Sequence, residues 1–176
     1  MEPDNPLVPI WEAYQITKDC LKVTQRTVDR ENENFLKDTR FIGTSKDEAT
    51  DKIGKSRSEA DDYVVLSLWV AFERFIINYV QEKGSIILQK QPSSFSRKFY
   101  DRIRDAVEYW RVDDVLDMFK NGWVNAELIG YAKNIKRYRD WLAHRNPAKA
   151  SPPKVTPETA HRILSRLMQE IQNLSS

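Results

Sequence analysis

Apolar residues recur at helical spacing along most of the chain. The strongest pattern runs from about Glu59 to Lys83, where apolar side chains occupy nearly every face of the expected helix. A helix of this kind is buried on most of its surface, either at the centre of a bundle or between a bundle and a dimer partner. Gly84 is placed to end it, as a glycine just past a helix usually does. The apolar positions are Val65, Leu66, Leu68, Trp69, Val70, Phe72, Ile76, Ile77 and Tyr79.

The N-terminal third is more polar. A helix is expected to begin near Ile10, and one apolar residue in seven follows through residues 7–42, which makes a thin stripe and not a coiled-coil seam. We expect one long helix, or two shorter ones, laid across a bundle. Ser45 and Glu48 are spaced as a capping box that can start the next helix. The chain therefore divides into a helical extension with a polar linker over residues 1–58 and a helical bundle over 59–176, together one cooperative domain.

Four more helices are expected in the C-terminal part. They span about 94–110, 113–120 and 125–144, and the last is capped by Thr156 with Pro157 in its first turn. With only five glycines in 176 residues, the chain does not resemble a many-turned β protein. The sequence thus predicts an all-α fold, a bundle of about five or six helices. The first of the four helices has apolar residues at core spacing, namely Phe95, Phe99, Ile103, Ala106 and Trp110.

Composition bounds the size and the location of the protein. The 176 residues are enough for a single hydrophobic core. Cys20 is the only cysteine, which excludes an intramolecular disulfide and suits a reducing compartment. The acidic, proline-rich N-terminus lacks the order of a secretory signal. Glu73, Arg74 and Asn78 interrupt the longest apolar run, which argues against a bilayer span. We expect a cytoplasmic protein with no membrane contact.

Basic residues gather between Tyr131 and Arg145, in the later part of the helix expected over residues 125–144 and just after it. The formal net charge of the whole chain is only +2, so any attraction for nucleic acid must come from such local clusters. Two interpretations are open: a surface that attracts phosphate, or a solvated helix face whose C-terminal cations are favoured by the helix dipole. The cations are Lys133, Lys136, Arg137, Arg139 and Arg145, and the only acid among them is Asp140.

The end of this helix reads RDWLAHRNP, residues 139–147. Arginine suits the binding of phosphate, and histidine moves protons near neutral pH. The motif resembles the HEPN superfamily (higher eukaryotes and prokaryotes nucleotide-binding), whose ribonuclease members carry an arginine, a polar residue and a histidine in the pattern R-x(4 to 6)-H. Arg139, Asp140 and His144 match the shorter spacing, and the all-helical layout over about residues 60–175 agrees with the resemblance.

The resemblance implies a metal-independent endoribonuclease with no cofactor. In that reaction the ribose 2′-hydroxyl attacks the adjacent phosphorus, so a base, an acid and a cation are required. His144 would be the base or the acid, and Arg139 would hold the nonbridging oxygens. Asp140 would orient the histidine or the ribose, or is a plain surface aspartate. The expected substrate-binding residues are Lys133, Lys136, Arg137, Arg145 and Asn146.

Glu73 is a possible auxiliary residue, because it lies in the middle of the most apolar helix. A buried carboxylate is costly unless it is paired. We therefore expect Glu73 to reach solvent, to pair with a cation, or to face a polar cleft.

Arg139 and His144 do not share one face of a regular helix, because five residues turn it by about 140°. Either the helix ends before His144, as Asn146-Pro147 permits, or a second copy of the motif completes the site across a dimer. The resemblance favours the dimer, since HEPN ribonucleases commonly bring two motifs together between protomers. The other histidine, His161, has no arginine at the matching distance and is expected on the surface.

The expected partners are RNA, a second copy of the chain, and an antitoxin or another regulatory protein. Stand-alone HEPN ribonucleases are frequently toxins, so growth arrest, phage defence or RNA processing is the implied role. Some relatives are controlled through a tyrosine two residues beyond the histidine; Asn146 stands there, which argues against that control. Two other classes are open: a HEPN-like module that binds RNA or a nucleotide without cleaving it, and a helical adaptor that meets a protein partner through Trp110, Trp123 and Trp141.

Overall fold

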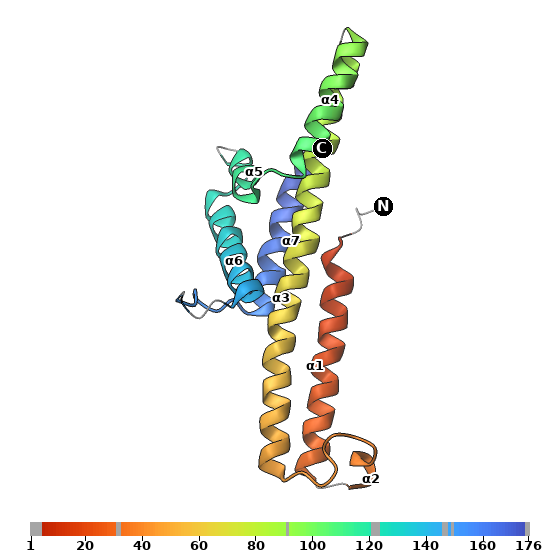
Figure 1. Cartoon of the computed structure of the whole chain (residues 1–176), viewed down its shortest axis with the longest axis vertical. Coiled ribbons are helices and arrows are strands. Elements are labelled where there is room, and N and C mark those ends of the chain that lie inside the picture. Colours follow the sequence, from red (N-terminus) through yellow and green to blue (C-terminus); the bar gives the residue numbers. More distant parts are fainter. Residues whose placement is uncertain are drawn as a thin grey trace.

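Every regular element of the described residues is a helix, which confirms the expected all-α class (Figure 1). The computed structural model describes residues 5–30, 33–90, 92–120, 124–145, 148 and 150–174. The elements are α1 (Leu7–Asp29), α2 (Glu33–Leu36), α3 (Lys46–Gly84), the 3₁₀ helix η1 (Ser85–Gln89), α4 (Ser93–Val107), α5 (Val112–Met118), α6 (Ala126–His144) and α7 (Pro157–Asn173).

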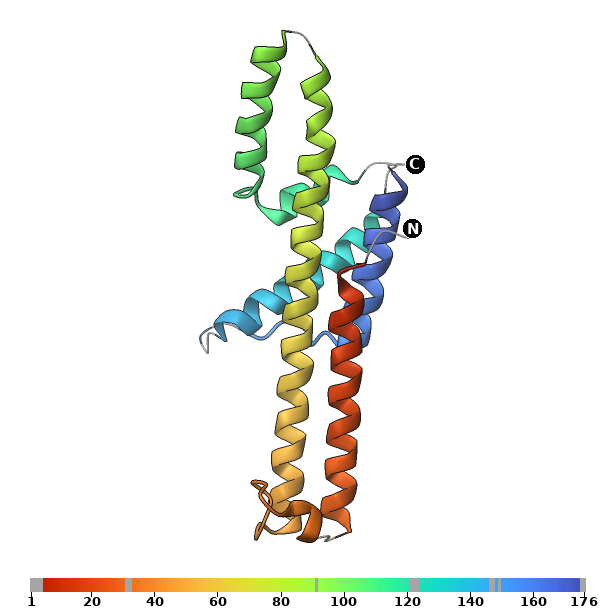
Figure 2. The ribbon, with the colours of Figure 1, turned by 90° about the vertical axis from the view of Figure 1, so that its right-hand side faces the viewer.

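The longest helix, α3, begins at Lys46, well before the expected start near Glu59. The Ser45 side chain accepts the Glu48 N–H at 3.3 Å, as the capping pattern predicted. Residues 46–58, expected as a polar linker, are therefore helical, and the boundary at residue 58 falls inside a continuous helix. This polar part of α3 runs alongside α1 (Figure 2). Between the two helices, Val28 is buried against Ala49 and Ile53.

The main core lies where α3 packs against α6 and α7 (Figures 1 and 2). Helix α7 starts as predicted, with the Thr156 side chain accepting the Thr159 N–H at 3.2 Å. Because α3 has neighbours on several sides, it buries most of the apolar residues of the pattern, whereas Val70 is 54% exposed. The fully buried side chains include Val65, Leu68, Trp69, Phe72 and Ile76 from α3, Ile129 and Ala132 from α6, and Leu164, Leu167 and Ile171 from α7.

Helix α4 extends away from the bundle as a hairpin with η1 and the end of α3 (Figures 1 and 2). The prediction that its apolar residues lie in the core is wrong for most of them. Phe95 is 62% exposed, Phe99 42% and Trp110 40%. The spacing is that of a helix with an apolar face, but in the described chain α4 packs only on η1 and α3, so no further layer covers that face.

Helix α1 is fastened to the start of α7 by an aromatic stack and an ion pair. The Trp11 and His161 rings stack 4.4 Å apart, and Lys18 pairs with Glu158 at 2.7 Å. His161, which was expected on the surface, is half-buried. Its Nε2 atom is buried without a hydrogen-bond partner among the described residues, and burial lowers the pKa of this imidazole.

Helix α3, together with η1 (Lys46–Gln89), is long and apolar enough to cross a membrane by length and composition. Within its most apolar window, 39% of the residues are buried inside the protein. Since α1, α6 and α7 all pack on this helix, the pattern is compatible with the core helix of a soluble protein.

Candidate functional site

Helix α6 carries the RDWLAH motif and continues through His144, the last residue of that motif. The Asn125 side chain starts it by accepting the Glu127 N–H at 2.8 Å. At the other end, Arg145 is in the left-handed region with φ 36°, and its N–H reaches the Trp141 carbonyl at 2.6 Å. The helix therefore does not end before His144, and that way of bringing Arg139 and His144 together is wrong. Asn146 and Pro147 lie outside the described residues.

Arg139 is held at the contact between α6 and α3. One terminal nitrogen donates to Asp140 Oδ1 at 3.0 Å, and the other lies 3.6 Å from Glu73 Oε2. Glu73 also accepts the Trp69 indole N–H at 3.2 Å. The side chains of Arg139 and Glu73 are 30% and 27% exposed. Of the three placements expected for Glu73, pairing with a cation is confirmed.

Asp140 uses both carboxylate oxygens on cations. Lys136 donates to Oδ2 at 2.8 Å and Arg139 to Oδ1. Burial raises the pKa of Asp140, but the hydrogen bonds from Lys136 and Arg139 outweigh burial and bring the pKa below its ordinary value. No hydrogen bond joins Asp140 to His144 within the described part of the chain. Within a single chain, Asp140 therefore positions Arg139 and not the histidine.

His144 is exposed on the last turn of α6. Because the helix is unbroken, it points about 140° away from Arg139. Among the residues that the structure describes, the His144 side chain has neither a hydrogen bond nor an ion pair. A single chain thus brings together Arg139, Asp140 and Glu73 and leaves His144 apart from them.

The expected substrate-binding cations are mostly paired with carboxylates from other helices. The exception is Arg137, which donates to the Asn134 side chain and has no carboxylate partner among the described residues. Asn146 lies outside those residues. The cluster that looked basic in sequence is therefore largely neutralised in space. The ion pairs are Lys133–Asp117 at 2.7 Å, Lys136–Asp113 at 3.3 Å, Lys136–Asp140 at 2.8 Å and Arg145–Glu59 at 3.0 Å.

Arg145 fastens the end of the motif helix to α3. Its guanidinium makes two hydrogen bonds of 3.0 Å to Glu59 and one of 3.3 Å to Asp62. The Tyr138 hydroxyl donates to the same Asp62 at 2.8 Å, and burial together with this carboxylate raises the pKa of Tyr138. We did not predict Glu59 or Asp62 as positioning residues. The signal was present, since both lie on the face of α3 that also carries Glu73.

The same region of α3 carries an exposed apolar strip, which we define as Tyr63, Leu66 and Val70. These residues follow helical spacing and continue to Glu73 three residues later. Tyr63 is 60% exposed and Val70 54%, while Leu66 is half-buried. The strip is therefore apolar surface beside the Arg139–Glu73 pair.

Metal ligands do not gather anywhere in the described ranges: no group of three or more His, Cys, Asp or Glu side chains is close enough to hold an ion. The chain was also compared with known protein families, with curated proteins and with solved structures, and none of the three comparisons found a match.

Proposed function

We propose that the protein is a metal-independent endoribonuclease of HEPN type, with Arg139 of one protomer and His144 of a second copy acting on the same phosphate. One observation carries this proposal: α6 continues without a break through His144. Within one helix the two side chains diverge by about 140°, so one protomer does not direct both at one phosphorus. A twofold dimer turns the second helix round and supplies the missing histidine.

The contacts of Arg139 leave some of its N–H donors for a phosphate. A guanidinium has five N–H donors, and the contacts with Asp140 and Glu73 occupy only part of them. The two carboxylates fix the orientation of the planar group, and the remaining donors can meet the nonbridging oxygens. His144 would take the 2′-hydroxyl proton or protonate the leaving oxygen. Glu73 and Asp140 act as positioning residues in this scheme.

The apolar strip on α3 supports the dimer. Tyr63 and Val70 expose large apolar side chains beside the pair that contains Arg139. A second copy covering this strip removes apolar surface from water and brings a second α6 close to the first. We therefore propose an isologous dimer in which both strips are buried.

We further propose a cytoplasmic role as a toxin, a phage-defence factor or an RNA-processing enzyme, restrained by an antitoxin or another regulatory protein. The unpaired Cys20 suits a reducing compartment. An unrestrained ribonuclease inside a cell would be harmful, which is the reason to expect a regulator.

The first test compares the native protein with His144→Ala on mixed cellular RNA in excess EDTA. We expect fragments with 2′,3′-cyclic phosphate ends, and a loss of at least about 100-fold in the variant, the usual effect of losing a general acid or base. Arg40→Ala, which changes an exposed residue far from the motif, is the control and should cleave normally. RNA binding without cleavage would favour a non-catalytic module, and neither activity would favour an adaptor.

The second test asks whether the site is shared. Arg139→Ala and His144→Ala proteins are each expected to be inactive, but a dimer with one copy of each retains one complete site. After subunits are exchanged at equal concentration, half of the dimers are mixed, and each mixed dimer has one intact site out of two. About one quarter of the native rate should therefore return. If mixing restores nothing, Arg139 and His144 do not form a site across two protomers.

A further inference from the structure

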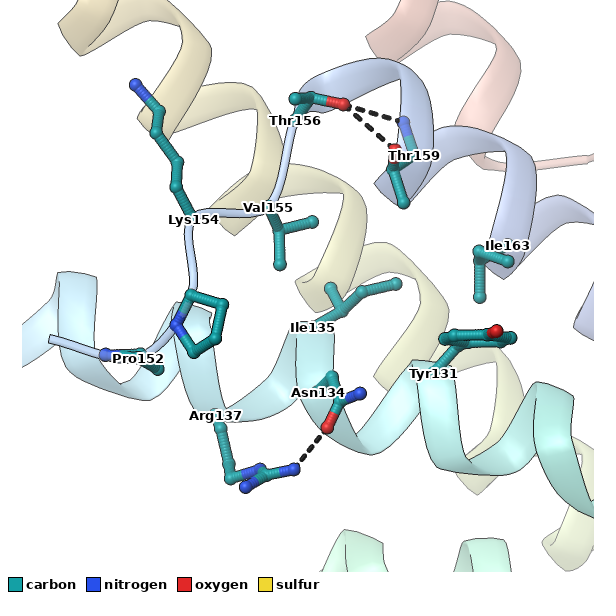
Figure 3. A pocket seen from close by; sticks show the side chains of 11 residues that line it. Tyr131, Asn134, Ile135, Arg137, Pro152, Lys154, Val155, Thr156, Thr159 and Ile163 are labelled. Carbon is teal, nitrogen blue, oxygen red and sulfur yellow. Dashed lines mark hydrogen bonds between the residues drawn. The ribbon is translucent and has the colours of Figure 1, made fainter.

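A pocket of about 320 Å³ lies between α6, the segment before α7 and the first turns of α7 (Figure 3). Ile135 and Ile163 are buried on its inner side, and Val155 is half-buried. None of the described residues that line it is acidic. The volume and the mixture of an apolar interior with a few polar groups are those of a small-ligand site.

Two flat surfaces enclose part of this pocket. The Tyr131 ring lies on one side and Pro152 on another (Figure 3). The Tyr131 hydroxyl donates to Glu127 at 2.9 Å, which holds the ring in place. An aromatic ring face of this kind stacks on any of the nucleic-acid bases, because every base is planar.

The polar groups on α6 suit the edge of a base and its phosphate. The Arg137 guanidinium donates to the Asn134 carbonyl oxygen, which leaves the Asn134 amide N–H groups as donors (Figure 3). A side-chain amide recognises the donor and acceptor pattern of a base edge. Arg137 has no carboxylate partner in the described chain, so its charge remains for a phosphate.

The pocket also lies on the same side of α6 as His144. Arg137 and His144 are seven residues apart, which places them within about 20° of one another and roughly 10 Å apart along the helix. At 3.4 Å per stacked nucleotide, this distance corresponds to about three nucleotides of a single strand. A strand that follows this face can therefore leave a base in the pocket and bring a phosphate to His144.

We infer that this pocket binds one unpaired base of a single-stranded RNA, with Arg137 on the adjoining phosphate. The inference rests on the proposed function and deepens it, because it assigns a base-binding position about three nucleotides from the scissile phosphate. Tyr131 stacks on the base, Asn134 contacts its edge, and Ile135 and Ile163 form the apolar floor.

The test uses RNA that stays intact, so all variants are made in the His144→Ala protein. A fluorescent RNA oligonucleotide is prepared as a series in which one base at a time is replaced by an abasic site, and binding is measured by anisotropy. We expect one position to weaken binding by about tenfold when its base is absent, as the loss of one stacked base does. Thr159→Phe, which fills the pocket, should remove this position dependence.

Two further variants keep the test interpretable. Asn134→Ala changes an exposed residue, so it is expected to fold and to reduce the position effect to a few-fold. Thr17→Phe makes the same change as Thr159→Phe on the exposed face of α1 and should leave the profile as it is. Tight binding with the same profile in all variants overturns the pocket while leaving the proposed function standing. If none of the proteins binds RNA, the pocket is overturned, and the cleavage assay with native His144 decides whether the proposed function fails as well.

Discussion

Two segments of the chain are rich in basic residues, but they differ in how many of their cations have carboxylate partners. On α6 and at Arg145, which caps it, the lysines and arginines other than Arg137 meet carboxylates from α3, α5 and α6 itself. The hairpin tip, which we define as residues 83–90 and 92–100, contains no acidic residue. Its Lys90, Arg97 and Lys98 have no carboxylate partner among the described residues. Clustering in sequence therefore does not by itself indicate free positive charge.

The two segments also differ in burial. The α3–α6 junction, where Trp69, Glu73 and Arg139 meet, lies against the core. The hairpin tip exposes Phe95 and Phe99, whose rings stack 5.7 Å apart. A rigid, paired junction is suited to hold catalytic groups, whereas the tip offers unpaired cations and apolar side chains to its surroundings.

The largest contrast should appear in stability. Trp69→Ala removes a fully buried ring from the junction and should lower the free energy of unfolding by about 3–5 kcal/mol. Phe95→Ala, on the exposed tip, should change it by less than about 0.5 kcal/mol. Urea unfolding of both variants, at two protein concentrations, measures the difference. Equal losses of unfolding free energy in the two variants would mean that the tip is buried in solution. If the unfolding free energy also depended on protein concentration, a second copy of the chain would be what buries it.

A smaller contrast is expected in the reactivity of lysines. Lys133 and Lys136 lie in ion pairs with side chains only 24% and 23% exposed, whereas Lys90 and Lys98 are exposed and have no carboxylate partner in the described chain. An ion pair is worth up to about 1 kcal/mol, so acetylation of the α6 lysines should be slower by up to about fivefold. Limited acetylation followed by mass spectrometry gives the rates. Asp117→Asn should speed the acetylation of Lys133 and of Lys120, which pairs with the same carboxylate, but not that of Lys136. Equal rates for Lys133, Lys136, Lys90 and Lys98 would show that the pairs do not persist.

The helices could be predicted from sequence because apolar periodicity reports which face of a helix is apolar. Trp69 and Phe72 are buried as expected, and Ser45 and Thr156 cap the helices that they were expected to cap. The same periodicity does not tell whether another element covers the face. Phe95 therefore resembles a core residue in sequence and is exposed in the hairpin.

The site was predictable only in part, for a related reason. The sequence identified Arg139 and His144 as candidates and gave the angle between them. The carboxylates that pair with the basic helix come from distant segments, such as Asp117 on α5 and Glu59 on α3, and a local pattern does not reveal them. Whether the helix continued through His144 was decided by its C-terminal contacts, in which Arg145 reaches Glu59.

The smallest expected effect is a difference between the two segments in how their amide protection responds to pH. The hydrogen bonds from Arg145 hold the pKa of Glu59 below its ordinary value, and those from Lys136 and Arg139 do the same for Asp140 against the opposing effect of burial. Because these pKa values are lower in the folded state, the stabilisation is complete above the ordinary glutamate value of about 4.3 and is lost as the pH falls through the folded values. The hairpin tip has no carboxylate to protonate. Amide protection in the last turns of α6 should therefore fall by about twofold more than in the tip on acidification.

Hydrogen exchange corrected for the intrinsic rate at each pH measures this difference. Glu59→Gln imitates the protonated state, so it should loosen the end of α6 at neutral pH and reduce the further loss in acid. Glu82→Gln, an exposed glutamate at the base of the hairpin, is the matched control and should leave both segments as they were. If the tip lost protection as fast as α6, the ion pairs would not be what distinguishes the two basic segments, and their difference would have to lie in burial alone.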